Sequence, residues 1–314
     1  MGINKENILK RVELGHTYLI NQIQANGKFI YQRNMDGTIK KGKYNMLRHA
    51  GCLWAINTVG NRPIENNIDG AFTYLNSKFK RFSEFLFLVD KGHTKLGGNA
   101  LAILAHTQHC ITESPYLIEG LVGGLKTFVY PDKLISKFEI IQDTFLETPF
   151  KSEYYPGEAA LALVECGEPG AALDLIHPLY KQYECTHDHW VLQALGKLHP
   201  IYKGTRIIGK IIEDFTYKIA GTIMREEHLY AGRSCAIACR IEGMVPAYSV
   251  ASNNTLKSQY AEFLTHWVDH LLAYQDMNTE SVTYGAFWQD NKYRIDYTQH
   301  AICALHSYAK LLKS

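Results

Sequence analysis

The residues of this chain that are best suited to chemistry lie at the starts of six apolar segments. Each segment is rich in small or aliphatic residues, and its first turn carries polar, charged or aromatic groups. If the six starts meet at one place in the fold, they form a site that offers acids, bases and cations. The segments read LRHAGCLWAI from Leu47, LGGNALAILAH from Leu96, YYPGEAALALV from Tyr154, HDHWVLQAL from His187, GRSCAIACRIEG from Gly232 and YTQHAICAL from Tyr297.

Glu158 is the clearest candidate for acid or base catalysis. Pro156 suits the first turn of a helix, where its missing N–H costs nothing, and Glu158 then falls in the same turn. The helix dipole favours a carboxylate there, so Glu158 has a structural interpretation as a helix-start residue. Because only apolar residues follow it, Glu158 is also a candidate general acid or base, flanked by Tyr154 and Tyr155.

Arg48 and His49 stand together at the start of the first segment, shortly after Tyr44. Burying an unpaired guanidinium is costly, so Arg48 needs either a carboxylate partner in the protein or an anionic ligand. His49 is either a hydrogen-bonded core residue or a group that carries a proton. We expect Arg48 and Tyr44 to contact a substrate and His49 to take part in catalysis.

The last segment and the loop before it carry a second dense group of candidates. Trp288, Asp296, Tyr297 and His300 lie within thirteen positions, in a stretch typical of a ligand-facing loop. Asp296 and His300 are candidate catalytic residues, and the aromatic side chains are candidate substrate contacts. The alternatives are that Asp296 caps the helix and that His300 belongs to a hydrogen-bonded core.

Two arginines are expected on one face of the fifth segment. Arg233 and Arg240 are seven positions apart, which places them about 10 Å apart along a helix. One arginine could hold a substrate anion while the other pairs with Glu242 or Glu158. Structural pairing of both arginines is the alternative.

The fourth segment raises the question of a metal. His187 and His189 form an HxH pattern beside Cys185, so zinc has to be considered. Side chains at i and i+2 diverge on a helix, however, and no second metal-binding motif completes a site. We therefore expect no metal and no cofactor, with His189 and Trp190 as substrate contacts or as core residues.

The second segment has a glycine-rich start, in which Lys95, Gly97, Gly98 and Asn99 are close together. It matches neither the GxxxxGK[ST] phosphate loop nor the GxGxxG dinucleotide pattern. The exposed amides and Asn99 could bind a ligand oxygen, and tight packing explains the two glycines equally well.

A longer amphipathic helix is expected before each apolar segment, from apolar residues at 3.6-residue spacing. The apolar segments themselves have few charges after the first turn, as expected of helices surrounded by neighbours. The alternation predicts a ring of about twelve helices forming a single domain over residues 1–314. The β-prone runs GKFIYQRN, EFLFLVDKG, SKFEIIQDTF and TYGAFWQDNKYRIDY predict short hairpins or extended loops at its mouth. The amphipathic helices are expected at residues 8–24, 67–79, 116–128, 170–183, 206–224 and 256–274.

Composition excludes several classes of protein. Hydrophobic residues make up 46% of the 314 residues and charged residues 20%, as in a globular protein. The formal charge of +2 gives no electrostatic case for nucleic acid or an anionic membrane. The charged N-terminus and the lack of a long apolar run indicate a cytoplasmic protein, in which the seven cysteines are reduced.

The chain resembles the (α/α)6-toroid superfamily in its alternation of helices, and RIDYTQHAICAL is similar to the closing helix of glucuronyl C5-epimerase-like proteins. The superfamily includes glycoside hydrolases, polysaccharide lyases, sugar epimerases and isoprenoid-handling enzymes. The resemblance implies an all-α toroid whose substrate lies at the starts of the inner helices. The residues gathered there would be Arg48, His49, Glu158, His189, Arg233, Asp296 and His300.

These observations predict a carbohydrate-active enzyme, a hydrolase, lyase or epimerase, for an acidic or polyhydroxylated glycan. The absence of GxSxG and HExxH patterns leaves acid, base and cation chemistry, which suits glycans better than acyl transfer. Glu158 would act with His49 or His300, Arg48 and Arg233 would bind carboxylate or sulfate, and Tyr155, Trp190 and Trp288 would stack on sugars. The alternative is a noncatalytic module that binds a glycan or a protein in a polysaccharide-assembly system.

Overall fold

Twelve α-helices alternate between inner and outer positions in the computed structural model, which describes residues 4–42, 44–60, 66–108, 115–130, 133–181 and 188–312. The six apolar segments form the inner helices, and each helix begins within two residues of its predicted start. The inner helices are α2 (Met46–Val59), α4 (Leu96–Thr107), α6 (Tyr155–Glu165), α8 (His189–Tyr202), α10 (Ser234–Val250) and α12 (Ile295–Ala309).

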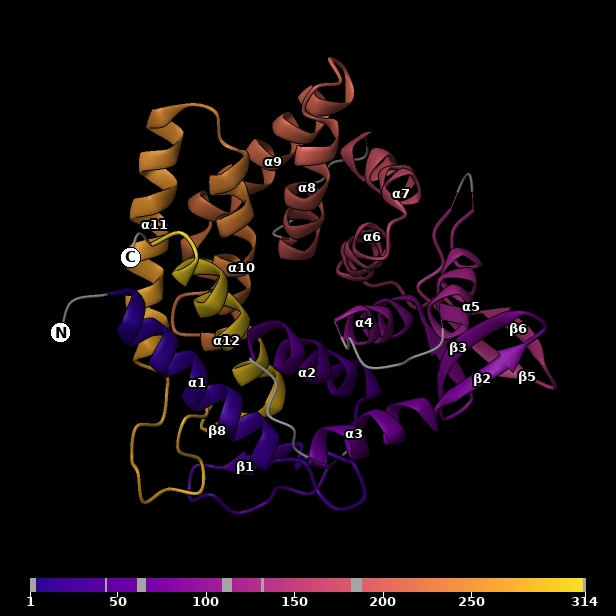
Figure 1. Ribbon diagram of the computed structural model, residues 1–314, viewed down its shortest axis with the longest axis horizontal. Coiled ribbons are helices and arrows are strands. Elements are labelled where there is room, and N and C mark those ends of the chain that lie inside the picture. Colours follow the sequence, from indigo (N-terminus) through magenta and orange to yellow (C-terminus); the bar gives the residue numbers. More distant parts are fainter. Residues whose placement is uncertain are drawn as a thin grey trace.

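The inner helices close into a ring (Figure 1). Each contacts the next one along the chain, and α12 in turn contacts α2. Small residues allow the close approach that this packing needs. A Cβ on Gly243 of α10, for example, would lie only 3.1 Å from the Cα of His189 on α8. The ring predicted from the alternation of helices is therefore present.

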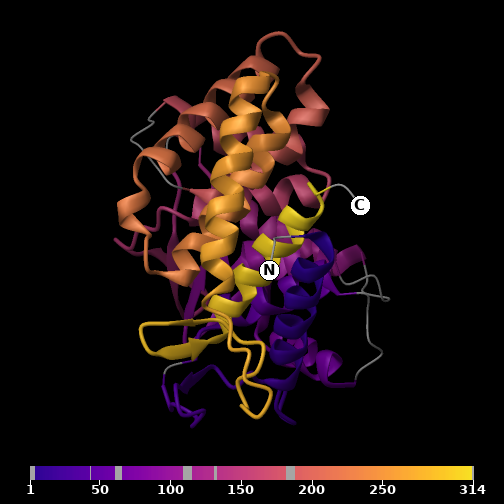
Figure 2. The same cartoon turned by 90° about the vertical axis from the view of Figure 1, so that its left-hand side faces the viewer.

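The outer helices cover the ring, and each packs its apolar face against the inner helices beside it. On α9, Ile212, Phe215, Ile219 and Ile223 share one face at helical spacing and are buried. Figure 2 shows α11 along the outside of the ring and α1 beside α12. The outer helices are α1 (Lys5–Asn21), α3 (Asn66–Asn76), α5 (Pro115–Lys126), α7 (Pro169–Lys181), α9 (Ile208–Arg225) and α11 (Asn254–Leu272).

Two antiparallel sheets accompany the ring, so the prediction of an all-α fold was wrong in this respect. A five-stranded sheet has the order β2 (Phe79–Phe82), β3 (Phe85–Asp90), β4 (His93–Lys95), β5 (Lys137–Ile141) and β6 (Thr144–Glu147). A three-stranded sheet has the order β1 (Gln32–Asn34), β8 (Lys292–Arg294) and β7 (Trp288–Gln289).

The predicted β-prone runs form these strands, but they also pair with runs that are far away in the sequence. Strand β4 pairs with β5, and β1 pairs with β8, which no local turn specifies. The apolar middle of β3 is buried and packs against α5 and α4, so the sheet extends the core of the ring. Strand β4 leads directly into α4 and β8 into α12, so the sheets position the first turns of two inner helices.

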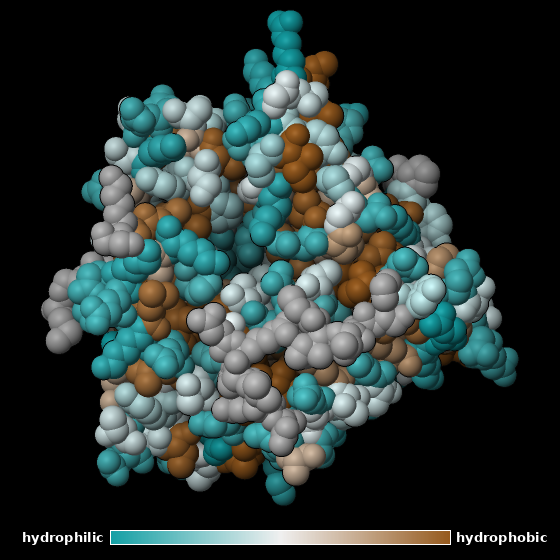
Figure 3. All heavy atoms as spheres, viewed as in Figure 1, coloured by the Kyte–Doolittle hydropathy of each residue, from teal (hydrophilic) through white to brown (hydrophobic). Residues whose placement is uncertain are grey.

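Hydrophilic and hydrophobic residues are intermixed on the face shown in Figure 3, which is hollowed near its centre. In the part of the chain that the structure describes, none of the helices combines the length and apolar character needed to cross a membrane.

Candidate active site

A cavity of about 320 Å³ lies where the inner helices begin. We call it the active-site cavity. All six inner helices contribute to its lining, as the sequence pattern predicted. Its lining residues are Leu47, Arg48, Leu101, Tyr154, Glu158, His189, Trp190, Leu229, Arg233, Cys235, Ala236, Cys239, Arg240, Gln289, Arg294, Asp296, Tyr297, Gln299 and His300.

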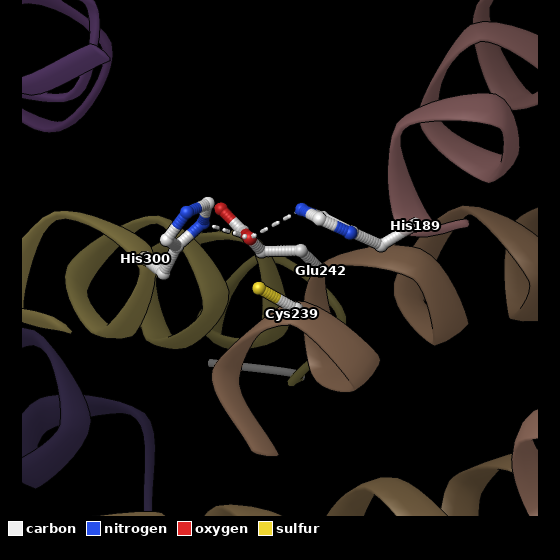
Figure 4. Close-up of side chains that lie close together, drawn as sticks. All are labelled: His189, Cys239, Glu242 and His300. Atoms are coloured by element: carbon white, nitrogen blue, oxygen red, sulfur yellow. Dashed lines mark hydrogen bonds and ion pairs between the residues drawn. The ribbon is translucent and has the colours of Figure 1, made fainter. Parts of the chain in front are cut away.

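Glu242 of α10 lies between two histidines of this cavity, His189 of α8 and His300 of α12 (Figure 4). The Nδ1 atom of His300 is 2.8 Å from Oε2 of Glu242, and Nε2 of His189 is 3.6 Å from the same oxygen. The centroids of the two imidazole rings are 5.5 Å apart. The sequence had suggested an arginine as a partner for Glu242. In the structure its partners are the two histidines.

The two histidines differ in protonation at neutral pH. Burial, helped by the positive charges of His300 and Arg240, holds the pKa of His189 well below its ordinary value. Burial also acts to lower the pKa of His300, but the charge of Glu242 and its hydrogen bond raise that pKa to about 9. Burial raises the pKa of Glu242, an effect that the charge of His300 opposes. His189 is thus neutral while His300 carries a proton.

Glu158 brings a carboxyl group to the cavity, from the first turn of α6 as predicted. Its side chain is buried, and Oε2 has no hydrogen-bonding partner among the described residues. Burial and the charge of Asp188 raise the pKa of Glu158 to about 8, while the charge of His300 acts to lower it. At neutral pH this carboxyl group is mostly protonated and can donate to a substrate oxygen.

Gly97 of α4 makes room for Glu158. We expect Gly97→Ala to destabilise the protein by about 1 to 3 kcal/mol, because the new methyl group would overlap Oε2 of Glu158 and the ring of Tyr155. Urea denaturation measures this loss. Gly98→Ala is the matched control, since its Cβ would lie 3.4 Å from Leu88, an ordinary contact distance. Equal losses in the two variants would contradict this role of Gly97.

Asp296 forms ion pairs with two guanidinium groups rather than capping α12. Its Oδ2 is 2.9 Å from Nε of Arg48 and 2.8 Å from Nη2 of Arg294. The N-cap position of α12 belongs to Arg294, so the capping interpretation of Asp296 was wrong. Arg48 is half-buried and also donates to the hydroxyl of Tyr31, and its ion pair with Asp296 is the carboxylate partner that the sequence left as one of two alternatives. Asp296 thereby positions two cations at the cavity.

Arg233 and Arg240 bring further positive charge to the cavity. The Arg240 guanidinium is buried over the ring of Tyr230, and its Nε has no hydrogen-bonding partner. Arg233 occupies the N-cap position of α10 and is exposed. Within the described ranges neither arginine forms an ion pair with Glu242 or Glu158, so the structural pairing considered from the sequence is absent. Both are available to an anionic ligand.

Aromatic side chains form part of the cavity wall. Trp190 is only 3% exposed, and its ring lies 4.9 Å from the ring of His189 and 5.9 Å from that of His300. The Arg294 guanidinium lies over the ring of Tyr297, with its Cζ atom 4.3 Å from the centroid of that ring. Trp190 thus contacts both histidines and restricts their positions, and one part of its side chain faces the cavity.

Other predicted residues lie outside the cavity. His49 is fully buried, with Nδ1 at 2.8 Å from the hydroxyl of Tyr44 and Nε2 at 3.0 Å from the carbonyl of Ala71. Burial lowers the pKa of His49 to about 4, so it is a neutral core residue. Tyr155 packs against Phe150 instead of lining the cavity.

Trp288 is also absent from the cavity lining, because its ring packs on Tyr274 at a centroid distance of 4.9 Å. In the glycine-rich start of α4, Asn99 is fully buried and accepts from the amide of Leu88 and donates to Thr94. Asn99 therefore joins α4 to the sheet, which is the packing interpretation.

Three residues of the cavity lining and the buried Glu242 beside them have donor atoms of the kinds that bind transition metals. The donor atoms of His189, Cys239, Glu242 and His300 all lie within 4.8 Å of one another. If all four bound zinc, the site would be closed, with no open position for a water molecule. His187 and Cys185, from which a zinc site was considered, lie outside the described residues.

The sequence reasoning missed several residues of the cavity. Gln299, whose Nε2 is buried without a hydrogen-bonding partner, lies beside the predicted His300. Cys239 and Arg294 also line the cavity, and neither was among the predicted site residues. A polar residue close to the start of an inner helix was the available signal for Gln299. No comparable signal marked Cys239, since cysteine is common in buried helices.

Comparisons with solved structures place the chain among toroid-type folds. It is similar to a D-mannose isomerase (TM-score 0.68, 14% identity, covering 98% of this chain and 97% of the isomerase). It is also similar to an alpha-amylase from Clostridium perfringens (TM-score 0.62, 11% identity, 96% and 98% covered). A third similar structure is the type II terpene cyclase MstE from Scytonema (TM-score 0.59, 10% identity, 98% and 99% covered).

All three have (α/α)6-toroid-type folds, so the toroid predicted from the helix alternation is confirmed at the level of fold. No protein-family model matches the chain, and no curated protein matches it. At these identities the likeness shows the fold alone.

Proposed function

We propose that this protein is a carbohydrate-active enzyme that transfers protons on an acidic or polyhydroxylated sugar, as an epimerase or isomerase does. The observation that carries the proposal is the pair of histidines, His189 and His300, which lie on either side of Glu242 in opposite protonation states. A neutral imidazole can accept a proton while a neighbouring imidazolium donates one, and this pairing is what moving a hydrogen on carbon requires.

The proposed reaction begins on an open-chain sugar with its carbonyl group beside the histidine pair. His189 takes the proton from the carbon next to the carbonyl, and the bonding electrons move to the carbonyl oxygen. That oxygen receives the proton of His300, which leaves an enediol. Return of a proton to carbon, at the same carbon or its neighbour, then gives an epimer or an isomer and restores both histidines.

Three other features support a sugar as the substrate. Protonated Glu158 can donate a hydrogen bond to a hydroxyl or carbonyl oxygen. Arg240 lines the cavity, and its Nε donor has no hydrogen-bonding partner among the described residues. The name of one similar structure, D-mannose isomerase, describes a reaction on a sugar, and its fold covers nearly all of this chain.

Hydrogen exchange tests the proposal directly. The protein is incubated in D2O with a panel of aldoses, uronic acids and their oligosaccharides, and the reactions are followed by 1H NMR. We expect one class of sugar to lose the signal of the hydrogen on carbon 2, the carbon next to the carbonyl, without gaining a reducing end. New reducing ends would indicate a hydrolase, and a new carbon–carbon double bond would indicate a lyase. Binding without any reaction would support the noncatalytic module.

Metal removal tests the roles assigned to the histidines. We expect activity to survive dialysis against EDTA, because the proposed reaction uses only side chains of this chain. Metal analysis of the purified protein accompanies the assay. One zinc ion per chain, lost in a Cys239→Ser variant together with the activity, would contradict the proposal, since a closed four-ligand site would occupy both histidines.

A further inference from the structure

A second cavity adjoins the active-site cavity. Its volume is about 390 Å³, and we call it the lysine cavity because Lys91, Lys95 and Lys137 line it. Leu47 and Arg48 of α2 line both cavities, so the two have a common wall at the start of that helix. The remaining lining residues are Tyr31, Tyr44, Asn45, Met46, Leu88, Asp90, His93 and Gly98.

Two of the lysines face each other in an unfavourable arrangement. Lys95 of β4 and Lys137 of β5 are directly opposite in the antiparallel register. Like charges at such positions destabilise a strand pair. Neither forms an ion pair with a carboxylate in the described part of the chain, and Asp90 is the one acidic residue that lines the cavity. Burial and the charge of Lys137 lower the pKa of Lys95, in keeping with this crowding.

Other donors surround the same cavity. The Nδ1 atom of His93 is buried and has no hydrogen-bonding partner among the described residues. Helix α4 begins directly after Lys95, and no side chain caps its first turn. The amides at the start of a helix and its dipole favour an anion. An anion bound here would offset the repulsion between Lys95 and Lys137.

We propose that the lysine cavity binds an anionic group of the substrate, a carboxylate or phosphate, while the reacting sugar lies beside His189 and His300. The inference rests on the proposed function for the identity of the ligand as a saccharide. The anion site stands on the charges and register of Lys95 and Lys137. The substrate class is then a uronic acid or a sugar phosphate rather than a neutral sugar.

Binding measurements test this subsite without requiring turnover. Wild-type protein and a Lys95→Gln/Lys137→Gln variant are titrated calorimetrically with trigalacturonic acid, its methyl ester and inorganic phosphate, at constant ionic strength. We expect the wild type to bind the acid at least tenfold more tightly than the ester. The double variant is expected to lose at least tenfold in affinity for the acid and for phosphate, but not for the ester.

One further readout and a control variant separate anion binding from a structural role. Without ligand, the double variant is expected to unfold at the same or a higher temperature than the wild type, because the repulsion between the lysines is removed. Lys80→Gln is the control, since Lys80 is an exposed residue of β2 in the same sheet and does not line the cavity. It should leave all three titrations unchanged.

Unchanged affinity of the double variant for both anions would overturn the proposal. So would a wild-type protein that binds neither trigalacturonic acid nor phosphate at millimolar concentration. The proposed function fails separately, if no sugar undergoes hydrogen exchange, because the titrations do not depend on turnover.

Discussion

Replacing His300 by Asn is expected to lower kcat by two to four orders of magnitude on any sugar that the wild type converts. His300 is 13% exposed at the cavity, and Glu242 holds its imidazole protonated through a 2.8 Å hydrogen bond. Asn is neutral and cannot supply a proton to the carbonyl oxygen. The measurement is hydrogen exchange on carbon, followed by 1H NMR, with thermal unfolding to show that the variant is folded.

The pH profile of the wild type provides the companion test. Because the pKa of Glu158 is raised to about 8 and that of His300 to about 9, activity should fall as pH rises through this range. The ion pair between His300 and Glu242 also stabilises the folded protein. This stabilisation should be present at lower pH and should be lost as pH rises through about 9. Glu242→Gln removes the charge that raises this pKa, so it should move the alkaline limb to lower pH.

His306→Asn is a matched control for these variants, because His306 lies on the same helix but not at the active-site cavity. We expect it to keep wild-type kcat and an unchanged alkaline limb. A folded His300→Asn variant with more than a tenth of wild-type kcat would rule out His300 as the acid.

Replacing Glu158 by Gln is expected to stabilise the protein above pH 8. Burial raises the pKa of Glu158 to about 8, against an ordinary value of 4.5. As pH rises from about 4.5, the unfolded chain loses this proton while the folded chain keeps it, so the folded state loses relative stability. Above pH 8 the resulting penalty is on the order of 5 kcal/mol, and Gln, which does not ionise, avoids it.

Urea denaturation of both proteins at pH 5 and pH 9 measures this effect. The difference in the free energy of unfolding should be small at pH 5 and should favour Glu158→Gln at pH 9. Glu153→Gln is the control, because Glu153 is exposed and close in sequence. If Glu158→Gln is no more favourable at pH 9 than at pH 5, Glu158 is not held in its neutral form.

Much of the architecture follows from local patterns in the chain. The 3.6-residue spacing of apolar residues on α9, and the small residues that follow the first turn of α6, reflect what each helix must bury. These requirements act within one helix, so they can be recognised without knowing its neighbours. The placement of Glu158 in the first turn of α6 follows from Pro156 in the same way.

The sheets could be predicted only as short β-prone runs. The pairing of β4 with β5, and of β1 with β8, depends on segments that the ring brings together. The opposition of Lys95 and Lys137 is a consequence of that register. A cross-strand pair has no signature in either strand alone, so the lysine cavity could not be recognised from the chain.

The candidate catalytic residues show the same division. The types and helix positions of His189 and His300 can be read from the chain, and so can the need of Arg48 for a carboxylate. Which partners they meet depends on closure of the ring, which brings α8, α10 and α12 around Glu242 and brings α2 beside Asp296. His49 lies near the start of an apolar segment, as His300 does, and the sequence predicted a catalytic role for both. In the structure His49 faces the core. A charge or a proton affinity depends on burial and on neighbours within a few ångströms, and those distances are properties of the packed helices.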